Sequence, residues 1–216
     1  GMSPYKFTKM DTEKEKRFNS YKNIFKEYTD YFHNEILKAE NNHALKYLEL
    51  RGINQNIIKE YNLGYVPWQN NFYEKIKTKF SEEEIMLTGL FYKNDKTNTF
   101  VHRFNSRIIF PINNLIGETI AFGGRIIKES SFAKYINSPE TEFYKKGRTV
   151  FNLDKAKTLR AEIDEVVIVE GYMDVVSLYA AGIKNVISNS GTALTEVQIE
   201  LIWKFFSNPI ICLDGD

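Results

Sequence analysis

Cysteine and histidine are scarce in this 216-residue sequence, which contains one Cys and three His. A single cysteine, Cys212, cannot form a disulfide within the chain, and a zinc ribbon needs about four Cys or His ligands. The histidines His33, His43 and His102 lack ligand spacing, so we expect each on the surface or on a helix face. Cys212 lies in an apolar segment, and we expect it to be a buried small hydrophobe. These absences exclude a disulfide framework and a zinc ribbon made within this chain, and they favour a reducing compartment.

Long apolar runs are missing as well. No run approaches the ~18 to 20 residues that span a bilayer, and the N-terminal residues lack the apolar core of a signal peptide. We therefore expect a soluble, cytoplasmic protein with no membrane partner. The Gly-Lys-Ser/Thr pattern of a phosphate-binding loop is also absent, which argues against an ATP-driven motor.

The net charge of +1 conceals an uneven distribution of charge along the chain. Residues 101–150 hold eight Lys/Arg against four Asp/Glu, a balance of +4, whereas residues 151–216 hold five against ten, a balance of −5. A basic middle can face phosphates and an acidic end can hold divalent cations, although solvated surface charge also produces such contrasts.

The first 125 residues predict helices followed by a small sheet. Apolar residues recur at helical spacing from residue 11 onwards, which predicts one or two amphipathic helices. A further short helix is expected over residues 42–50, ending at Arg51-Gly52-Ile53. A helix pair is expected over residues 72–90, with Ser81 as an N-cap. Short β-rich runs then occur at residues 100–101, 108–110 and 119–122. Their spacing and turn residues predict an antiparallel sheet.

The last third alternates strands with helices. Apolar strands are expected at residues 166–169, 186–187 and 209–213, separated by helices at 174–181 and 195–206. Because parallel strands need long crossovers, this alternation predicts a parallel, doubly wound sheet. We therefore predict an α+β subdomain over residues 1–160, followed by an α/β domain over residues 161–216.

Carboxylates follow two of the predicted parallel strands. Glu170 ends the first strand and Asp174 begins the next helix, while Asp214 and Asp216 follow the third strand. Because the carboxyl ends of parallel strands form the usual ligand-binding edge, these acids can share one hard cation. Taken alone, each segment also fits a solvated strand end or a turn, and Asp174 fits a helix N-terminus.

Several motifs, in order along the chain, resemble bacterial DnaG-type primases. The segment Glu170-Gly171-Tyr172-Met173-Asp174, followed by Asp214-Gly215-Asp216, resembles the Toprim fold that primases share with topoisomerases and certain nucleases. Within the Toprim proteins, two segments resemble the primases specifically: residues 170–175 and 190–195. Four upstream segments also resemble primases: residues 45–67, 103–112, 121–125 and 134–147. The resemblance covers roughly residues 40–216. It implies that the α/β domain over residues 161–216 is a Toprim domain truncated at its Asp-x-Asp motif, and that the subdomain over residues 1–160 carries a basic groove.

The resemblance implies synthesis of RNA primers from ribonucleoside triphosphates on a single-stranded DNA template, assisted by Mg²⁺ or Mn²⁺. Phosphoryl transfer mainly needs positioning and charge neutralisation, which clustered acids supply by holding metal against the triphosphate. Asp214 and Asp216 are implied metal ligands. Glu170 is either a ligand or the group that helps deprotonate the attacking 3′-hydroxyl, with Asp174 as a supporting acid, and the sequence does not choose between these roles.

The basic middle of the chain supplies the implied contacts to nucleic acid or nucleotide. The candidate residues are Arg103, Arg107, Arg125, Lys134, Asn137 and Lys146. We expect the neighbouring Gly123-Gly124 pair to let the backbone approach a ligand closely.

Full-length members of the resembled family carry parts that are not in this sequence. We expect zinc only in their N-terminal domain and the contact with the replicative helicase only in their C-terminal region. Because the sequence stops inside the Toprim fold, we expect these 216 residues alone not to synthesise primers. The alternatives are another Toprim nuclease or topoisomerase-like protein, and a non-catalytic single-strand-binding module, which would have no use for the acids.

Overall fold

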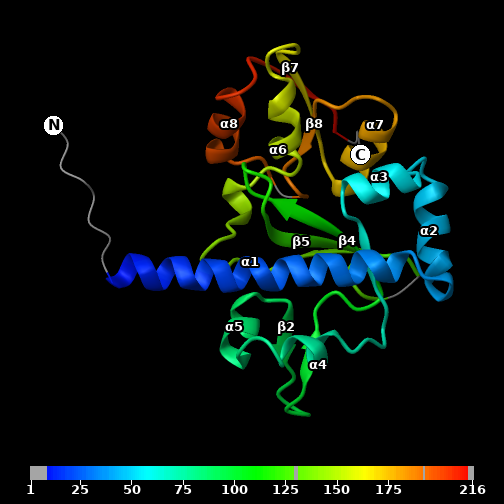
Figure 1. The fold of residues 1–216 in the computed structure, drawn as a ribbon. Coiled ribbons are helices and arrows are strands. Elements are labelled where there is room, and N and C mark those ends of the chain that lie inside the picture. Colours follow the sequence, from blue (N-terminus) through cyan, green and yellow to red (C-terminus); the bar gives the residue numbers. More distant parts are fainter. Residues whose placement is uncertain (1–8, 129–130, 192, 214–216) are drawn as a thin grey trace.

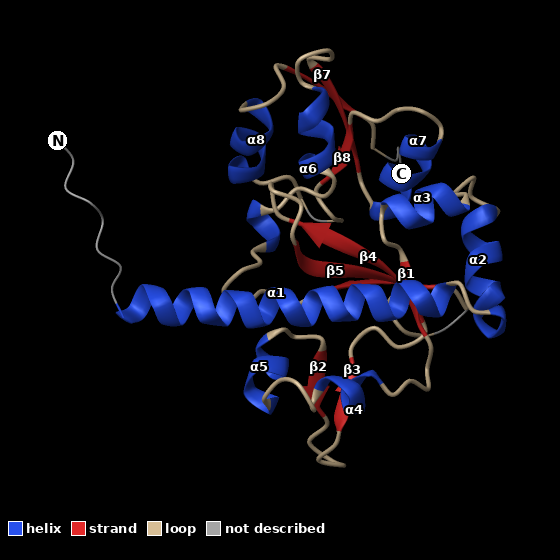
Figure 2. Cartoon of the chain, viewed as in Figure 1, coloured by secondary structure: helices blue, strands red, loops and turns tan. Residues whose placement is uncertain are grey.

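A long helix crosses the molecule and separates its secondary structure into two sides (Figure 1). In this computed structural model, residues 9–128, 131–191 and 193–213 are described. A four-stranded antiparallel sheet and a three-stranded parallel sheet lie on one side of helix α1 (Lys9–Ile36), and a small two-stranded sheet lies on the other (Figure 2). Within the described ranges, no helix is long and apolar enough to cross a membrane.

Helix α1 buries one face of aromatic and aliphatic side chains. The buried residues recur at three- and four-residue spacing: Tyr21, Ile24, Phe25, Tyr28, Phe32 and Ile36. This spacing places them on one stripe of the helix, which packs on the antiparallel sheet. The one or two helices predicted from residue 11 onwards are the single helix α1, and the short helix predicted over residues 42–50 is confirmed as α2 (Asn42–Glu49).

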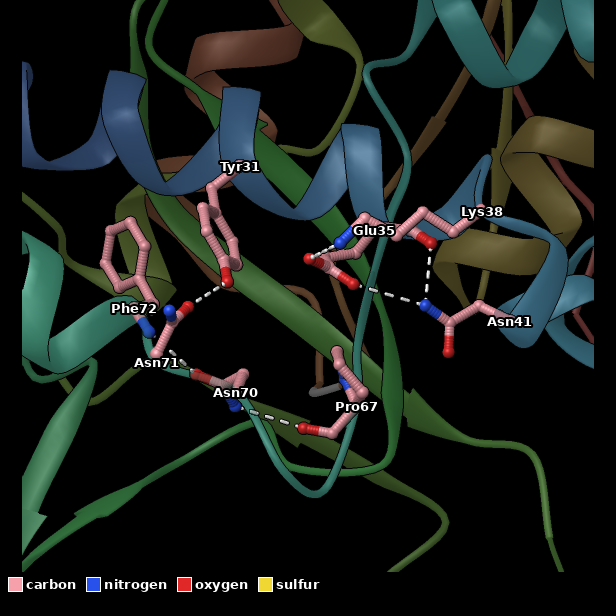
Figure 3. Close-up of polar contacts among 8 residues, drawn as sticks. All are labelled: Tyr31, Glu35, Lys38, Asn41, Pro67, Asn70, Asn71 and Phe72. Carbon is pink, nitrogen blue, oxygen red and sulfur yellow. Dashed lines mark hydrogen bonds and ion pairs between the residues drawn. The ribbon is translucent and has the colours of Figure 1, made fainter.

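Polar contacts hold the C-terminal end of α1 (Figure 3). The Tyr31 hydroxyl donates to Asn71 Oδ1 at 2.6 Å, which ties the helix to the segment before α4. The carboxylate of Glu35 is buried, and it accepts from Lys38 Nζ at 2.6 Å and from Asn41 Nδ2 at 3.3 Å. Asn41 Nδ2 also donates to the Glu35 carbonyl oxygen at 2.8 Å, so the last helical turn does not leave that oxygen unsatisfied.

The antiparallel sheet has the strand order β1-β4-β5-β6. Its strands are β1 (Gly64–Val66), β4 (Arg107–Asn113), β5 (Thr119–Ile126) and β6 (Tyr135–Asn137). The predicted antiparallel pairing of the runs at 108–110 and 119–122 is confirmed in β4 and β5. The strands β1 and β6, of three residues each, were not predicted. The predicted run at 100–101 does not join this sheet, because β3 (Phe100–His102) pairs with β2 (Phe91–Lys93) in the separate two-stranded sheet.

The parallel sheet confirms the predicted alternation of strands and helices. Its strands are β7 (Glu165–Val169), β8 (Val186–Ser188) and β9 (Asn208–Ile211), in the order β8-β7-β9, with α7 (Tyr172–Ala180) and α8 (Glu196–Trp203) between them. Both neighbours pair with β7 in parallel. Every residue of β9 is exposed, and so is Cys212 directly after it. The prediction that Cys212 is buried was therefore wrong, because β9 is an edge strand within the described residues.

The remaining helices are short. They are α3 (Gln55–Glu60), α4 (Phe72–Ile76), α5 (Glu82–Leu87), α6 (Leu153–Ala156) and the 3-10 helices η1 (Ala39–Asn41), η2 (Lys146–Arg148) and η3 (Lys157–Leu159). The predicted helix pair over residues 72–90 corresponds to α4 and α5. Ser81 caps α5 as predicted: its hydroxyl accepts from the Glu84 backbone N–H, and the Glu84 carboxylate accepts from the Ser81 backbone N–H.

The hydrophobic core joins the two larger sheets. One buried cluster runs from Ile36 through Phe110 of β4 to Val169 and Val186 of the parallel sheet. A backbone bridge between Phe151 and Ser188 adds hydrogen bonds of 2.8 and 3.2 Å across the same junction. The domain boundary at residues 160/161 stays a prediction.

His102 departs from its predicted surface position. It is 7% exposed and its ring lies among Tyr28, Phe32 and Phe91, with ring centres 4.8–5.3 Å away. Burial lowers the pKa of His102 to about 3, so the ring is neutral at physiological pH. No local pattern in the sequence indicates this burial, since a polar residue in a short strand is more often exposed than surrounded by aromatic rings.

Candidate active site

Glu170 stands at the carboxyl end of β7, directly before a turn into α7. Its side chain is exposed, while its backbone carbonyl oxygen accepts from Ser188 Oγ at 2.8 Å and from Gly191 N at 3.0 Å. These bonds tie the ends of the neighbouring strands β7 and β8 together. A cleft of about 500 Å³ opens here, lined by Glu170, Gly191 and, after β9, Leu213. Glu170 therefore occupies the edge where parallel sheets bind ligands.

Asp174 lies in the first turn of α7 and is also exposed. Its Oδ2 accepts from the Gly171 backbone N–H at 2.9 Å, so the carboxylate closes the turn between Glu170 and the helix. A negative charge in the first turn also interacts favourably with the helix dipole. Asp174 thereby helps to hold the strand end that presents Glu170.

The predicted metal ligands Asp214 and Asp216 lie outside the described residues. Before them, Cys212 N donates to Ile168 O at 2.9 Å and continues the pairing with β7. No group of three or more His, Cys, Asp or Glu side chains that could hold a metal occurs in the part of the chain that the structure describes.

Asn137 connects the basic segment to the acidic strand end. The side-chain amide satisfies its neighbours when its nitrogen faces the Tyr172 hydroxyl at 2.5 Å and its oxygen accepts from Lys146 Nζ at 2.9 Å. Burial lowers the pKa of Lys146. Since Tyr172 follows Glu170 by two residues, the structure brings Asn137, Lys146 and the Glu170 turn together.

The two glycines in β5 have a different role from the predicted one. A Cβ on Gly123 would lie 2.3 Å from the Tyr172 ring, and a Cβ on Gly124 would lie 2.5 Å from the Phe104 ring. The glycines therefore make room for two packed aromatic rings, and this explains why both positions lack a side chain.

Arg125 lies in a stack of aromatic rings and guanidinium groups. Its guanidinium carbon is 5.2 Å from the centre of the Tyr47 ring and 5.0 Å from that of Tyr135, and its Nη1 donates to the Tyr135 hydroxyl. The guanidinium of Arg51 covers Tyr47 at 4.0 Å. Burial raises the pKa of Tyr135, with Arg125 opposing this effect and the charge of Asp174 adding to it. The stack therefore lies within electrostatic range of Asp174, and through it Arg51 and Tyr47, which the sequence analysis did not identify, join the site.

Arg107 and Lys134 lie together in a supporting arrangement. Arg107 Nη1 donates to the Lys134 carbonyl oxygen at 3.2 Å, and Nη2 donates to that of Ala133 at 2.8 Å. Burial lowers the pKa of Arg107. The Lys134 side chain is exposed beside β6. Arg107 thus holds the backbone that presents Lys134.

Arg103 is set apart from the other candidates. Its Nε donates to the Gly89 carbonyl oxygen at 2.7 Å, and its guanidinium carbon is 5.8 Å from the centre of the Tyr92 ring. Burial lowers the pKa of Arg103. It follows β3 of the two-stranded sheet, which lies across α1 from the parallel sheet (Figure 1). The contacts described above pair Asn137 with Lys146 and Arg107 with the Lys134 backbone, and they place Arg125 on the Tyr135 ring. None of them involves Arg103.

Two family models match the sequence, one for each part of the fold. Residues 31–157 match the DNA primase catalytic core, N-terminal domain, and residues 164–216 match the Toprim domain. The chain belongs to the DnaG-type DNA primase family. This confirms the resemblance drawn from the motifs and the predicted fold class.

Curated primases share substantial identity with this member of the family. The chain is 42% identical over 176 residues to a DNA primase from Lactococcus lactis, and 36% identical over 206 residues to one from Legionella pneumophila. These matches cover 80% and 94% of this chain, but 27% and 35% of the two primases. The chain therefore spans about a third of the length of the curated relatives it matches.

Solved primase structures share the fold. The DnaG primase catalytic domain bound to ssDNA is 30% identical, with a TM-score of 0.84 over 94% of this chain and 63% of that one. The zinc-binding and RNA polymerase domains of Aquifex aeolicus primase are also 30% identical, with a TM-score of 0.81 over 100% of this chain and 51% of that one.

Proposed function

We propose that the protein containing this chain synthesises RNA primers on single-stranded DNA by template-directed nucleotidyl transfer from ribonucleoside triphosphates. The observation that carries the proposal is that the acidic end of strand β7, at Glu170, is connected through hydrogen-bonded side chains to the ammonium of Lys146. Glu170 stands two residues before Tyr172, whose hydroxyl contacts the amide that holds Lys146. Nucleotidyl transfer needs negative groups for metal and positive groups for the triphosphate in the same place.

A divalent metal, Mg²⁺ or Mn²⁺, belongs to this proposal. The exposed carboxylate of Glu170 at a cleft fits a hard cation, which prefers oxygen ligands. Asp214 and Asp216 would complete the ligand set, and the residue before them, Leu213, lines the same cleft as Glu170. The bound metal would neutralise charge on the triphosphate and lower the pKa of the attacking hydroxyl.

The described acids have separate roles in this proposal. Glu170 binds metal or accepts the proton of the attacking 3′-hydroxyl, for which its exposed position at the strand end is suited. Asp174 positions Glu170, because its carboxylate is already hydrogen-bonded to the Gly171 N–H inside the turn.

The cations divide into two groups. Lys146, held by Asn137 beside the Glu170 turn, contacts the triphosphate. Arg125 and the exposed Lys134 contact the template strand, and Arg107 supports Lys134 through the backbone. The relative solved with single-stranded DNA supports DNA as the template of this chain.

Three further parts of the proposal rest on membership of the family alone: a zinc-binding domain, a cellular location and a contact with the helicase. We propose that the whole protein carries a zinc-binding domain, as the Aquifex relative does, and that it works in the cytoplasm at the replication fork. A contact with the replicative helicase, through a region outside this chain, is part of the same proposal.

The test separates synthesis from cleavage. The full-length protein is incubated with single-stranded DNA, labelled ribonucleoside triphosphates and Mg²⁺ or Mn²⁺, and the products are resolved by length. Short RNA products that depend on both template and ribonucleotides are expected. Metal-dependent cutting of the DNA without RNA synthesis would instead identify a Toprim nuclease and overturn the proposal.

A further inference from the structure

Tyr172 has a fixed position between the two larger sheets. It is 2% exposed, and its ring stacks on Phe110 with centres 5.7 Å apart and meets Phe151 edge-on at 4.9 Å. The ring also fills the space above Gly123, where a Cβ would be 2.3 Å away. Packing on three sides leaves the hydroxyl in one place.

The Tyr172 hydroxyl is a neutral hydrogen-bonding group between polar neighbours. It is hydrogen-bonded to the Ser190 side chain, and it lies 2.5 Å from the amide nitrogen of Asn137. The same amide nitrogen faces the Ile136 carbonyl oxygen at 3.3 Å, which can only accept. The amide oxygen is therefore directed at Lys146 Nζ.

We propose that Tyr172 is a positioning residue for Lys146, which it holds through the Asn137 amide so that the ammonium is placed for the nucleotide triphosphate. This inference rests on the proposed function, in which Lys146 contacts the triphosphate. If the Tyr172 hydroxyl is removed, the amide loses the hydrogen-bond partner at 2.5 Å that holds it in place, and only the longer contact with the Ile136 carbonyl oxygen, at 3.3 Å, still selects its orientation. An amide turned by 180° presents its own N–H groups to the ammonium, so Lys146 then lacks its acceptor.

A second tyrosine allows this role to be separated from ordinary packing. The hydroxyl of Tyr61 is also buried, donates to Asn152 Oδ1 at 2.9 Å, and through Asn152 Nδ2 reaches the Val186 carbonyl oxygen at 2.8 Å. Tyr61 therefore makes the same kind of junction, a phenol bound to an asparagine between the two larger sheets. Its asparagine is bonded to a backbone carbonyl rather than to a lysine, which makes Tyr61→Phe the matched control.

The kinetic test compares Tyr172→Phe with Tyr61→Phe in the full-length protein. Both variants are expected to lower the melting temperature by similar amounts. Only Tyr172→Phe should raise the KM for ribonucleotides, on the order of tenfold, the equivalent of one charge-assisted hydrogen bond, with a smaller change in kcat. Equal effects of the two variants on KM would overturn the positioning role.

A second readout does not depend on synthesis. The ammonium form of Lys146 is stabilised by the Asn137 oxygen, so losing that acceptor should lower the pKa of Lys146 further. This pKa is measured by NMR titration of the isotope-labelled Lys146 side chain in the 216-residue chain. A lower Lys146 pKa in Tyr172→Phe, with an unchanged Lys146 pKa in Tyr61→Phe, supports the inference even if the protein synthesises no primers. Absence of primer synthesis would contradict only the proposed function. An unchanged Lys146 pKa overturns the inference.

A further variant keeps the test decisive if Tyr172→Phe does not fold. Asn137→Ala leaves the Tyr172 ring packed and removes the oxygen that Lys146 contacts, so it should produce the same fall in the Lys146 pKa. Adding Tyr172→Phe to Asn137→Ala should cause no further fall, because both act through one contact. Additive shifts would show that Tyr172 acts by another route.

Discussion

Replacing His102 by Phe should make the chain less sensitive to acid. The neutral His102 ring accepts the Phe104 N–H at Nδ1 at 3.2 Å, and its Nε2 has no hydrogen-bond partner among the described residues. Protonation would place a charge among Tyr28, Phe32 and Phe91, and burial accordingly lowers the pKa of His102 to about 3. An unfolded histidine titrates near 6.5, so the unfolded chain binds a proton that the folded chain excludes.

The sign and size of the effect follow from linkage. A depressed histidine pKa gives stability that is present above about pH 6.5 and is lost as the pH falls towards 3. At about 1.4 kcal/mol per pH unit, the shift from 6.5 to about 3 corresponds to about 5 kcal/mol in total, and to about 3 kcal/mol at pH 4.5. His102→Phe removes the titrating ring, so the variant does not lose this stability as the pH falls. It also leaves the Phe104 N–H without an acceptor, which costs about 1–3 kcal/mol at every pH.

The assay is urea unfolding at a series of pH values between 4.5 and 8. At pH 8, His102→Phe should be less stable than the original chain, and the two stability curves should approach or cross near pH 5. His43→Gln is the control, because its ring is exposed. Burial and the charge of Lys128 also lower the pKa of His43, so its removal should change the slope in the same direction as His102→Phe but by less. Parallel curves for His102→Phe and the original chain would refute the reasoning, since they would mean that the ring takes up its proton without unfolding.

Two further substitutions test the packing and the groove. Gly123→Ala should lower the free energy of unfolding by about 1–3 kcal/mol, because the added Cβ meets the Tyr172 ring. In the control Gly147→Ala the added Cβ would lie 3.4 Å from a methyl group, so the free energy of unfolding should change by less than about 0.5 kcal/mol. Equal losses for the two variants in urea unfolding would contradict this. Lys134→Ala should weaken single-stranded DNA binding and reduce the slope of log K against log salt by about 0.7, while Lys204→Ala, an exposed cation at the end of α8, should leave that slope unchanged. An unchanged slope of log K against log salt in Lys134→Ala would show that Lys134 does not contact the DNA backbone.

The parallel sheet could be predicted because its signals are local. An apolar strand such as 166–169 is recognised from its own residues, and the cap Ser81 is recognised from the three residues that follow it. The position of Glu170 at a strand end follows from the same local pattern.

The missed features depend on contacts between distant segments. The strands β1 and β6 have three residues each, so they exist only because β4 and β5 offer them partners. Arg51 follows an ordinary helix end in the sequence, and it joins the site only through Tyr47 and Arg125. Gly123 was assigned to a ligand because no local signal reveals that Tyr172, nearly 50 residues later, fills the space above it.

The most direct test of the account is primer synthesis by the full-length protein carrying Glu170→Gln, measured beside Glu165→Gln. Both glutamates are exposed on β7 or its end, but Glu165 begins the strand and Glu170 follows its carboxyl end, so only one lies at the cleft. The amide keeps the shape of the side chain and removes its charge. We predict that Glu170→Gln lowers the rate of synthesis by at least about 100-fold while Glu165→Gln stays near the original rate. Near-normal synthesis by Glu170→Gln would contradict the assignment of the chemistry to this strand end.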